Sequence, residues 1–305
     1  MTPKIGALCA IGAGVGFGTL GIFSTLYYDE GGDDFTLLVL RFCGAFVILA
    51  AIALARMRPA PTLGDAALTT LLGVATLGAS FCLLAGFETA SPGLVTLLFY
   101  VYPLIITVAA HLLFREELTP WRVGLLVLGM AGIALTVGVP DETTSEGILW
   151  GLGAGVCVSV YILGGRYVMA RSVDNIQFVV LSFGGGLIVL APAAAAAGVD
   201  GPSQAALGWA AVVIVVSTVV PTLLFYYAVR QIGAGGSARL ATIEPVVAVS
   251  LSYLVLGDAI SASQIAGGAL VVVAVALLAT PELAPGSTPP RADASDRACA
   301  QRSTS

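Results

Sequence analysis

A glutamate and a proline stand side by side near the middle of one apolar stretch, at Glu244 and Pro245. The stretch, GAGGSARLATIEPVVAVSLSYLVLGD at 233–258, is long enough to cross a bilayer as a helix. A carboxylate at bilayer depth is costly and usually faces a protein interior or a water-filled path. Because a proline also removes one helical hydrogen bond, the pair predicts a broken helix at midplane depth. Glu244 could accept a proton or a substrate amine there, or it could be a structural acid that caps the kinked backbone or pairs with an arginine.

Other chemically active side chains also lie in apolar stretches. Arg41, in VLRF, could bind a substrate carboxylate, although an arginine in this setting more often holds helices together. Aromatic residues could stack on a solute and offer hydroxyls, or could simply pack, and the candidates are Phe99, Tyr102, Tyr226 and Tyr227. Prolines within apolar stretches predict helix kinks at Pro103, Pro221 and Pro245.

The sequence predicts neither an enzyme site nor a cofactor. The glycine-rich runs lack the Lys-Ser/Thr of a phosphate loop, no cysteine pair has C-x-x-C spacing, and the single histidine, His111, makes no metal site. The acidic pair Asp33 and Asp34 would suit a membrane enzyme acting on lipid diphosphates, but such enzymes need several acids at set spacings plus bases. We therefore expect no catalytic residues, no metal, no cofactor and no nucleic-acid partner.

Membrane-spanning helices are the elements that must position these residues. Of the 305 residues, 58% are hydrophobic and 10% are charged, whereas a soluble domain carries about 25% charged residues. Because about 20 apolar residues span a bilayer, the chain predicts ten transmembrane helices. Their expected bounds are 5–28, 35–55, 66–87, 91–114, 120–139, 147–169, 175–198, 206–229, 235–257 and 262–280.

The loop charges predict how these helices are oriented. Lysine and arginine fall on one side, at Lys4, Arg56, Arg58, Arg115, Arg166, Arg171, Arg230 and in the tail. The loops on the other side hold no Lys or Arg and gather acids. By the positive-inside rule both termini are cytoplasmic, and we expect a multi-pass protein of the cell membrane. Arg239 lies near the cytoplasmic end of its helix, where its stem could reach water.

The two halves of the chain repeat each other. GAGV at 12–15 recurs at 153–156, and DDFTLLVLRFCGAFVILA at 33–50 aligns with DNIQFVVLSFGGGLIVLA at 174–191. One further residue of shift places Tyr102 on Glu244 and Pro103 on Pro245. Because each half has an odd number of helices, the second half enters the membrane from the opposite side. The predicted fold class is all-α integral membrane, with ten transmembrane helices as two five-helix inverted-topology repeats.

The same pattern predicts four segments. The first repeat is expected at 1–139 and the second at 147–280. A polar linker at 140–146 joins them outside the cell, and a disordered cytoplasmic tail occupies 281–305.

These features resemble the EamA-type branch of the drug/metabolite transporter superfamily. The likeness rests on the glycine-rich first helix of each half (GAGVGFG, GAGVCVS), on Arg41 and on the mid-helix prolines. Most specific is LLFREELTPWRVGLLVLGMAGIAL at 112–135, echoed more weakly by LVLGDAISASQIAGGALVVVAVAL at 254–277. The resemblance covers 5–280, and it departs from the pattern at Asp258-Ala259, where a glutamate is more usual.

The resemblance implies a polytopic carrier of small organic solutes, commonly an exporter of amino acids or related metabolites. We expect a secondary transporter of this kind, working by alternating access around a central cavity. The alternatives are a passive pore of the same fold and an integral membrane enzyme acting on lipid-linked substrates. The expected partners are a small-molecule solute and the bilayer, with protons as a candidate coupling ion. No motif specifies the substrate, the direction, the coupling ion or the oligomeric state.

Overall fold

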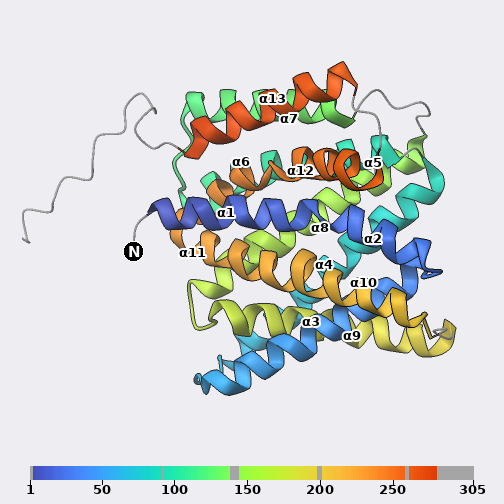
Figure 1. Ribbon diagram of the computed structural model, residues 1–305. Coiled ribbons are helices and arrows are strands. Elements are labelled where there is room, and N and C mark those ends of the chain that lie inside the picture. The colour runs from blue at the N-terminus through green and yellow to red at the C-terminus, as the bar shows by residue number, and fades with distance from the viewer. Residues whose placement is uncertain (1–2, 91, 138–143, 198–200, 258–260, 280–305) are drawn as a thin grey trace, which may run out of the picture.

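The computed structural model of the chain is a bundle of helices that run roughly parallel or antiparallel to one another (Figure 1). It describes residues 3–90, 92–137, 144–197, 201–257 and 261–279. No strand occurs in this part of the chain. Nine helices in it are long and apolar enough to cross a membrane, and Glu244–Leu256 is a shorter apolar helix. The predicted all-α membrane fold is confirmed.

The first half contains five spans, and the first and fourth are broken. Span 1 consists of α1 (Pro3–Gly18) and α2 (Leu20–Asp29). Spans 2 and 3 are single helices, α3 (Asp34–Arg56) and α4 (Leu63–Thr89). Span 4 consists of α5 (Pro92–Phe99) and α6 (Tyr102–Phe114), and span 5 is α7 (Pro120–Val137).

The second half has the same order of spans. Spans 6 and 7 are α8 (Ser145–Met169) and α9 (Asn175–Ala197). Span 8 runs through α10 (Gln204–Ile214), the π-helix η1 (Val215–Val219) and the first part of α11 (Val220–Ala241). The chain turns at Gly233, whose φ is +82°, so the rest of α11 begins span 9. Span 9 continues as α12 (Glu244–Leu251) and the π-helix η2 (Ser252–Leu256), and span 10 is α13 (Ala262–Ala279).

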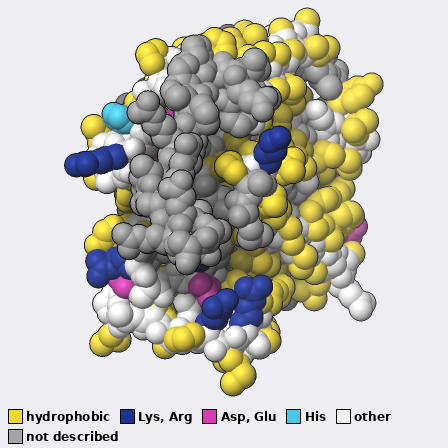
Figure 2. Space-filling view, turned by 90° about the vertical axis from the view of Figure 1, so that its left-hand side faces the viewer, with side chains coloured by type: hydrophobic (Ala, Val, Ile, Leu, Met, Phe, Trp, Pro, Cys, Tyr) yellow, Lys and Arg dark blue, Asp and Glu magenta, His cyan; other side chains and the backbone are white. Residues whose placement is uncertain are grey.

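The loops divide between two faces of the bundle. We call the face that holds the start of α1 the N-terminal face, and Figure 2 looks onto it and shows basic side chains spread around it. The helix ends on this face carry Lys4, Arg56, Arg58, Arg115, Arg166, Arg171 and Arg230, whereas the described helix ends on the opposite face carry Asp29, Glu30, Asp33, Asp34, Glu88 and Glu146. The charge asymmetry read from the sequence is therefore an asymmetry of the folded molecule.

Helix caps repeat with the register of the two halves. The Asp33 carboxylate accepts the Thr36 N–H at 2.9 Å and caps α3, and the Asp174 carboxylate accepts the Gln177 N–H at 3.0 Å and caps α9. Both pairs are related by 141 positions, which is the offset of the sequence repeat. A side-chain cap satisfies an N–H that the helix itself cannot. The same chemistry thus starts the second span of each half.

The halves are packed into each other rather than side by side. Span 1 lies against spans 8 and 9 through α1 and α11, and span 6 lies against spans 3 and 4 through α8, α4 and α5. Spans 2 and 7 also touch, as α3 and α9. Spans 5 and 10 form an outlying pair, α7 with α13, at the top of Figure 1. Each half therefore supplies part of the surroundings of the other half's broken helix.

The predicted bounds of the two repeats, the linker and the tail stay predictions. Residues 138–143 of the linker region and 280–305 of the tail lie outside the described residues, as does Asp258.

Candidate functional site

Two broken helices occupy equivalent places in the two halves. Two residues separate α5 from α6, and two separate α11 from α12. Tyr102 and Pro103 begin α6, and Glu244 and Pro245 begin α12. A proline has no N–H, and its ring clashes with the carbonyl four residues earlier, so a helix cannot run straight through it. Each proline therefore starts a new helical segment within its span.

Glu244 lies at one of these breaks, beside the aromatic residues of the other. Its side chain is half-buried and lies near the hydroxyl groups of Tyr100 and Tyr102, which belong to the other break. The Tyr102 ring centroid is 5.1 Å from that of Phe99 and 6.3 Å from that of Tyr100. Among the described residues Glu244 is the only carboxylate far from the ends of its span. The structure thus joins the two breaks through a carboxylate and a phenol.

The glycine-rich helices predicted at the start of each half press against these breaks. A Cβ on Gly14 of α1 would lie 2.8 Å from the Ala241 carbonyl oxygen, at the end of α11. A Cβ on Gly155 of α8 would lie 3.1 Å from the Phe99 carbonyl oxygen, at the end of α5. Small residues let helix backbones approach this closely in a membrane. The same type of contact occurs twice, since a glycine in the first helix of each half packs against the backbone at the break in the other half.

Arg41 is held by the π-helix of span 8. Its Nε donates to the Thr218 hydroxyl at 3.3 Å, and that hydroxyl donates to the Val213 carbonyl at 3.1 Å. Pro221 explains the widened turn, because it offers no N–H to the carbonyl of Ser217, four residues earlier. The Arg41 side chain is only partly buried, and nitrogen donors other than Nε remain at the tip of its guanidinium fork.

Tyr226 has its contacts away from this pair of breaks. Tyr226 is 1% exposed, and its ring centroid is 4.5 Å from that of Phe178 and 5.4 Å from that of Tyr161. Tyr227 is half-buried on α11. The structure therefore brings Glu244, Tyr102 and Phe99 together, places Arg41 against span 8, and gives Tyr226 to a separate aromatic cluster.

A second polar cluster, at the N-terminal face, has members to which the sequence gave no functional role. The Glu116 carboxylate, just after α6, accepts the N–H groups of Ala234 (2.9 Å) and Gly235 (3.0 Å) at the start of span 9. Arg239 is 8% exposed and donates to the Thr107 hydroxyl at 3.4 Å. The prediction that the stem of Arg239 reaches water is wrong, because α6 covers it. Glu116 lies within the motif at 112–135. The sequence feature that could have singled it out is an acidic residue next to a helix end that carries basic residues.

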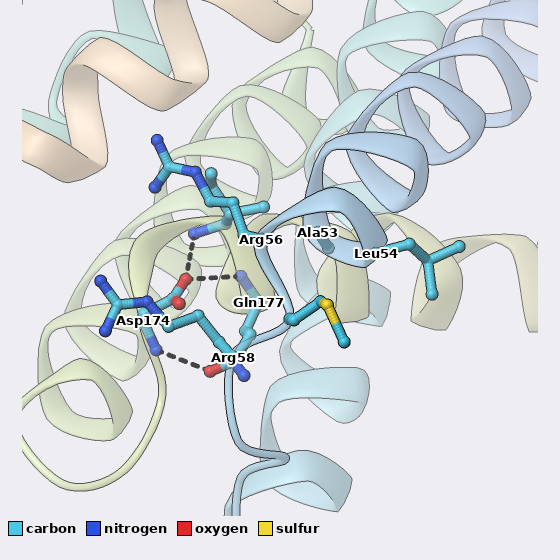
Figure 3. A pocket seen from close by; sticks show the side chains of 8 residues that line it. Ala53, Leu54, Arg56, Arg58, Asp174 and Gln177 are labelled. Carbon is cyan, nitrogen blue, oxygen red and sulfur yellow. Dashed lines mark hydrogen bonds between the residues drawn. The ribbon is translucent and has the colours of Figure 1, made fainter.

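A hollow of about 470 Å³ also opens at the N-terminal face, between the end of α3 and the start of α9 (Figure 3). Arg56, Arg58 and Asp174 line it. The Asp174 carboxylate is engaged in accepting the N–H groups of Ile176 (2.8 Å) and Gln177 (3.0 Å). These contacts organise a loop at the membrane surface, far along the chain from either helix break. The paired breaks, rather than this hollow, are the candidate functional site.

The chemistry available at the site is that of carboxyl, phenol and guanidinium groups. Within the described part of the chain, no three side chains of His, Cys, Asp or Glu gather where they could hold a metal ion. His111 is exposed near the end of α6, and its Nδ1 lies 2.8 Å from the Glu116 carbonyl oxygen. The carboxyl, phenol and guanidinium groups of the site are of the kinds that bind polar solutes, and a carboxyl group can also exchange a proton.

Comparisons with known proteins agree with this architecture. A model of the EamA-like transporter family matches residues 4–138 and 145–280. A protein of Archaeoglobus fulgidus described as an uncharacterized transporter is 26% identical over 258 residues, which are 84% of this chain and 90% of that protein. A crystal structure with 20% sequence identity has a TM-score of 0.79, covers 91% of this chain and 98% of its own, and so shares the fold. Because the family model covers both halves, this multi-pass membrane protein belongs to the EamA-like transporter family.

Proposed function

We propose that the protein is a secondary transporter that exports small organic metabolites, such as amino acids, by alternating access. One observation carries the proposal: the equivalent broken helices of the two halves meet through Glu244 and Tyr100. Half-helices that meet near the midplane supply free helix ends and polar groups where a solute can be held. Since the two breaks belong to different halves, movement of one half against the other would change the surroundings of the bound solute.

Each residue of the site has a proposed task. Glu244 accepts either a proton or the amine of the solute, and Tyr100 orients its carboxylate. Phe99 and Tyr102 give the solute an aromatic surface, and Arg41 offers its free guanidinium nitrogens to a solute carboxylate. Thr218 already binds the Nε of Arg41 (3.3 Å to the hydroxyl) and thereby fixes the direction of the fork.

The proposed orientation follows from the charges of the two faces. The basic N-terminal face is cytoplasmic and the acidic face is external, as the positive-inside rule requires. Both termini then lie in the cytoplasm, and the protein resides in the cell membrane.

The solute is to be found first, by a thermal-stabilisation screen of the purified protein over amino acids, nucleosides and sugars. A compound that binds the folded form raises its melting temperature. The best compound is then assayed for efflux and counterflow in reconstituted vesicles. Saturation with counterflow indicates a carrier, whereas non-saturating flux without counterflow would indicate the passive pore of the same fold.

The role of Glu244 is tested in the same vesicles with Glu244→Gln, which keeps the size of the side chain and its ability to accept a hydrogen bond. We expect the variant to fold, with a stability loss of about 1 kcal/mol or less, and to lose transport or its pH dependence. Glu88→Gln is the matched control, because Glu88 is exposed at the end of α4. Normal transport by Glu244→Gln at every pH would make Glu244 a structural residue and remove it from the mechanism.

A further inference from the structure

Glu116 ties span 4 to span 9 across the N-terminal face. Its two carboxylate oxygens accept the N–H groups of Ala234 and Gly235 at 2.9 and 3.0 Å. These N–H groups begin a helical segment and have no partner within it, so a carboxylate there is a strong cap. The capped segment runs on to the break at Glu244. While the cap is made, the start of span 9 cannot move away from the end of span 4.

Arg166 is a second possible partner for the Glu116 carboxylate and lies beside it. The Nε of Arg166, near the end of α8, lies 3.9 Å from Glu116 Oε1, which is too long for a hydrogen bond. This Nε is buried and has no hydrogen-bond partner in the described structure. A buried donor without a partner costs free energy. The observed state therefore satisfies the start of span 9 and leaves the Nε of Arg166 without a hydrogen bond, while the guanidinium lies 5.8 Å from the Phe114 ring centroid and forms only a long ion pair with Glu116.

Gly233 makes the capped arrangement possible. Its φ of +82° lies in the region that glycine favours, and the chain turns there from span 8 into span 9. A Cβ at this position would overlap the Glu116 carboxylate. The turn and the cap thus fit together only because the side chain at 233 is a hydrogen atom.

We propose that Glu116 is a gating residue that exchanges between two partners. In the state seen here it caps span 9 and closes the N-terminal face. When span 9 moves away, its N–H groups pass to water, and the carboxylate shifts onto the Arg166 guanidinium, which stabilises the open state. This inference rests on the proposed alternating access, and it adds that the two faces of the cycle differ in the partner of one carboxylate.

The proposed exchange predicts in which direction a substitution of Arg166 changes the frequency of opening at the N-terminal face. If Arg166 stabilises the open state, Arg166→Gln makes opening rarer. If Arg166 were instead a clamp of the closed state, the same substitution would make opening more frequent. The two roles therefore predict opposite changes in the accessibility of buried residues on span 9.

The experiment measures that accessibility without any solute. Ala238 is fully buried on the capped segment. A single cysteine is placed there in a chain whose own five cysteines are replaced, and its reaction with a membrane-impermeant maleimide is timed from the N-terminal face. We expect Arg166→Gln to slow labelling about two- to fivefold, the range of a partly exposed ion pair. Arg166→Lys, which keeps the charge, should restore much of the rate.

Two further variants isolate the role of the carboxylate. In a Glu116→Gln background, Arg166→Gln should no longer change the labelling rate, because its effect acts through that carboxylate. Arg58→Gln is the control, since Arg58 is exposed on the same face, in the loop after α3, and should leave the rate unchanged. Faster labelling of Arg166→Gln, or an equal effect in both backgrounds, would overturn the gate. Because no solute is used, either result is independent of whether the transport proposal holds.

Discussion

Gly14 offers a direct measure of how tightly span 1 is packed against the break in span 9. In Gly14→Ala the new methyl group would meet the Ala241 carbonyl oxygen at 2.8 Å and the Cγ2 of Ile243 at 2.7 Å. The carbonyl belongs to the backbone, so it cannot rotate away as a flexible side chain would. The helix end itself, two residues before α12, would have to shift.

The magnitude follows from a comparison within the same helix. Gly12 lies on α1 as well, but a Cβ there would meet only the Cδ1 of Leu224, at 3.4 Å. Both substitutions gain the same helix propensity, about 0.5–1 kcal/mol. Gly14→Ala alone adds the cost of overpacking, about 1–3 kcal/mol. The difference between the two variants should therefore be about 1–3 kcal/mol, with Gly14→Ala the less stable.

The assay is thermal inactivation in a mild detergent, followed by size-exclusion chromatography of the surviving monodisperse protein. Gly12→Ala should melt at or slightly above the temperature of the wild type, and Gly14→Ala several degrees lower. Transport should fall with Gly14→Ala even below its melting temperature, because the methyl group displaces the break. A Gly14→Ala protein as stable as Gly12→Ala would refute the close approach of span 1 to span 9.

Two other expectations concern the break and the orientation. Pro245→Ala restores a backbone donor and stiffens span 9, so it should lower the turnover number more than it raises KM, and an unchanged turnover number would argue against a working break. Single cysteines at Thr144 and Gly201 should react with an impermeant maleimide added outside intact cells, and cysteines at Pro59 and Arg171 should not. Any two of these four on the wrong side would contradict the proposed topology.

The sequence located the spans and the breaks at Pro103 and Pro245 because their causes are local, whereas it did not predict the break in span 1 between α1 and α2. The span predicted at 35–55 is α3, Asp34–Arg56, whose limits are a capping aspartate and the first basic residues after an apolar run. Pro103 and Pro245 each begin the second helix of a broken span, since the missing N–H acts wherever the rest of the chain lies. Hydropathy and the effect of a proline depend on residues adjacent in sequence, so both can be predicted without knowing the tertiary contacts.

Partners distant in sequence were beyond the reach of such patterns. Glu116 bonds to residues 118 and 119 positions away, and nothing in its neighbourhood indicates that span 9 begins there. Arg239 was expected to reach water because it lies near the cytoplasmic end of the helix predicted at 235–257, but it is buried and bonds to Thr107 of α6. Tyr226, like Tyr102, is a tyrosine within an apolar segment, so the sequence suggested the same role for both. The structure shows that the ring of Tyr226 contacts Tyr161 and Phe178 instead. In each case the outcome depends on which helix packs on which.

The symmetry of the fold draws attention to one chemical difference between the breaks, the carboxylate of Glu244. Tyr102 and Glu244 occupy the same first position of equivalent half-helices, each followed by proline. If the position served only to start a helix, a tyrosine would suffice in both halves, because the proline and the backbone make the break. A carboxylate in one half alone adds a charge that can be gained or lost, and Tyr100 of the other half lies near it. The duplicated backbone thus explains the break, whereas the glutamate has no counterpart at Tyr102, and the proposed binding of a cationic group or a proton would account for it.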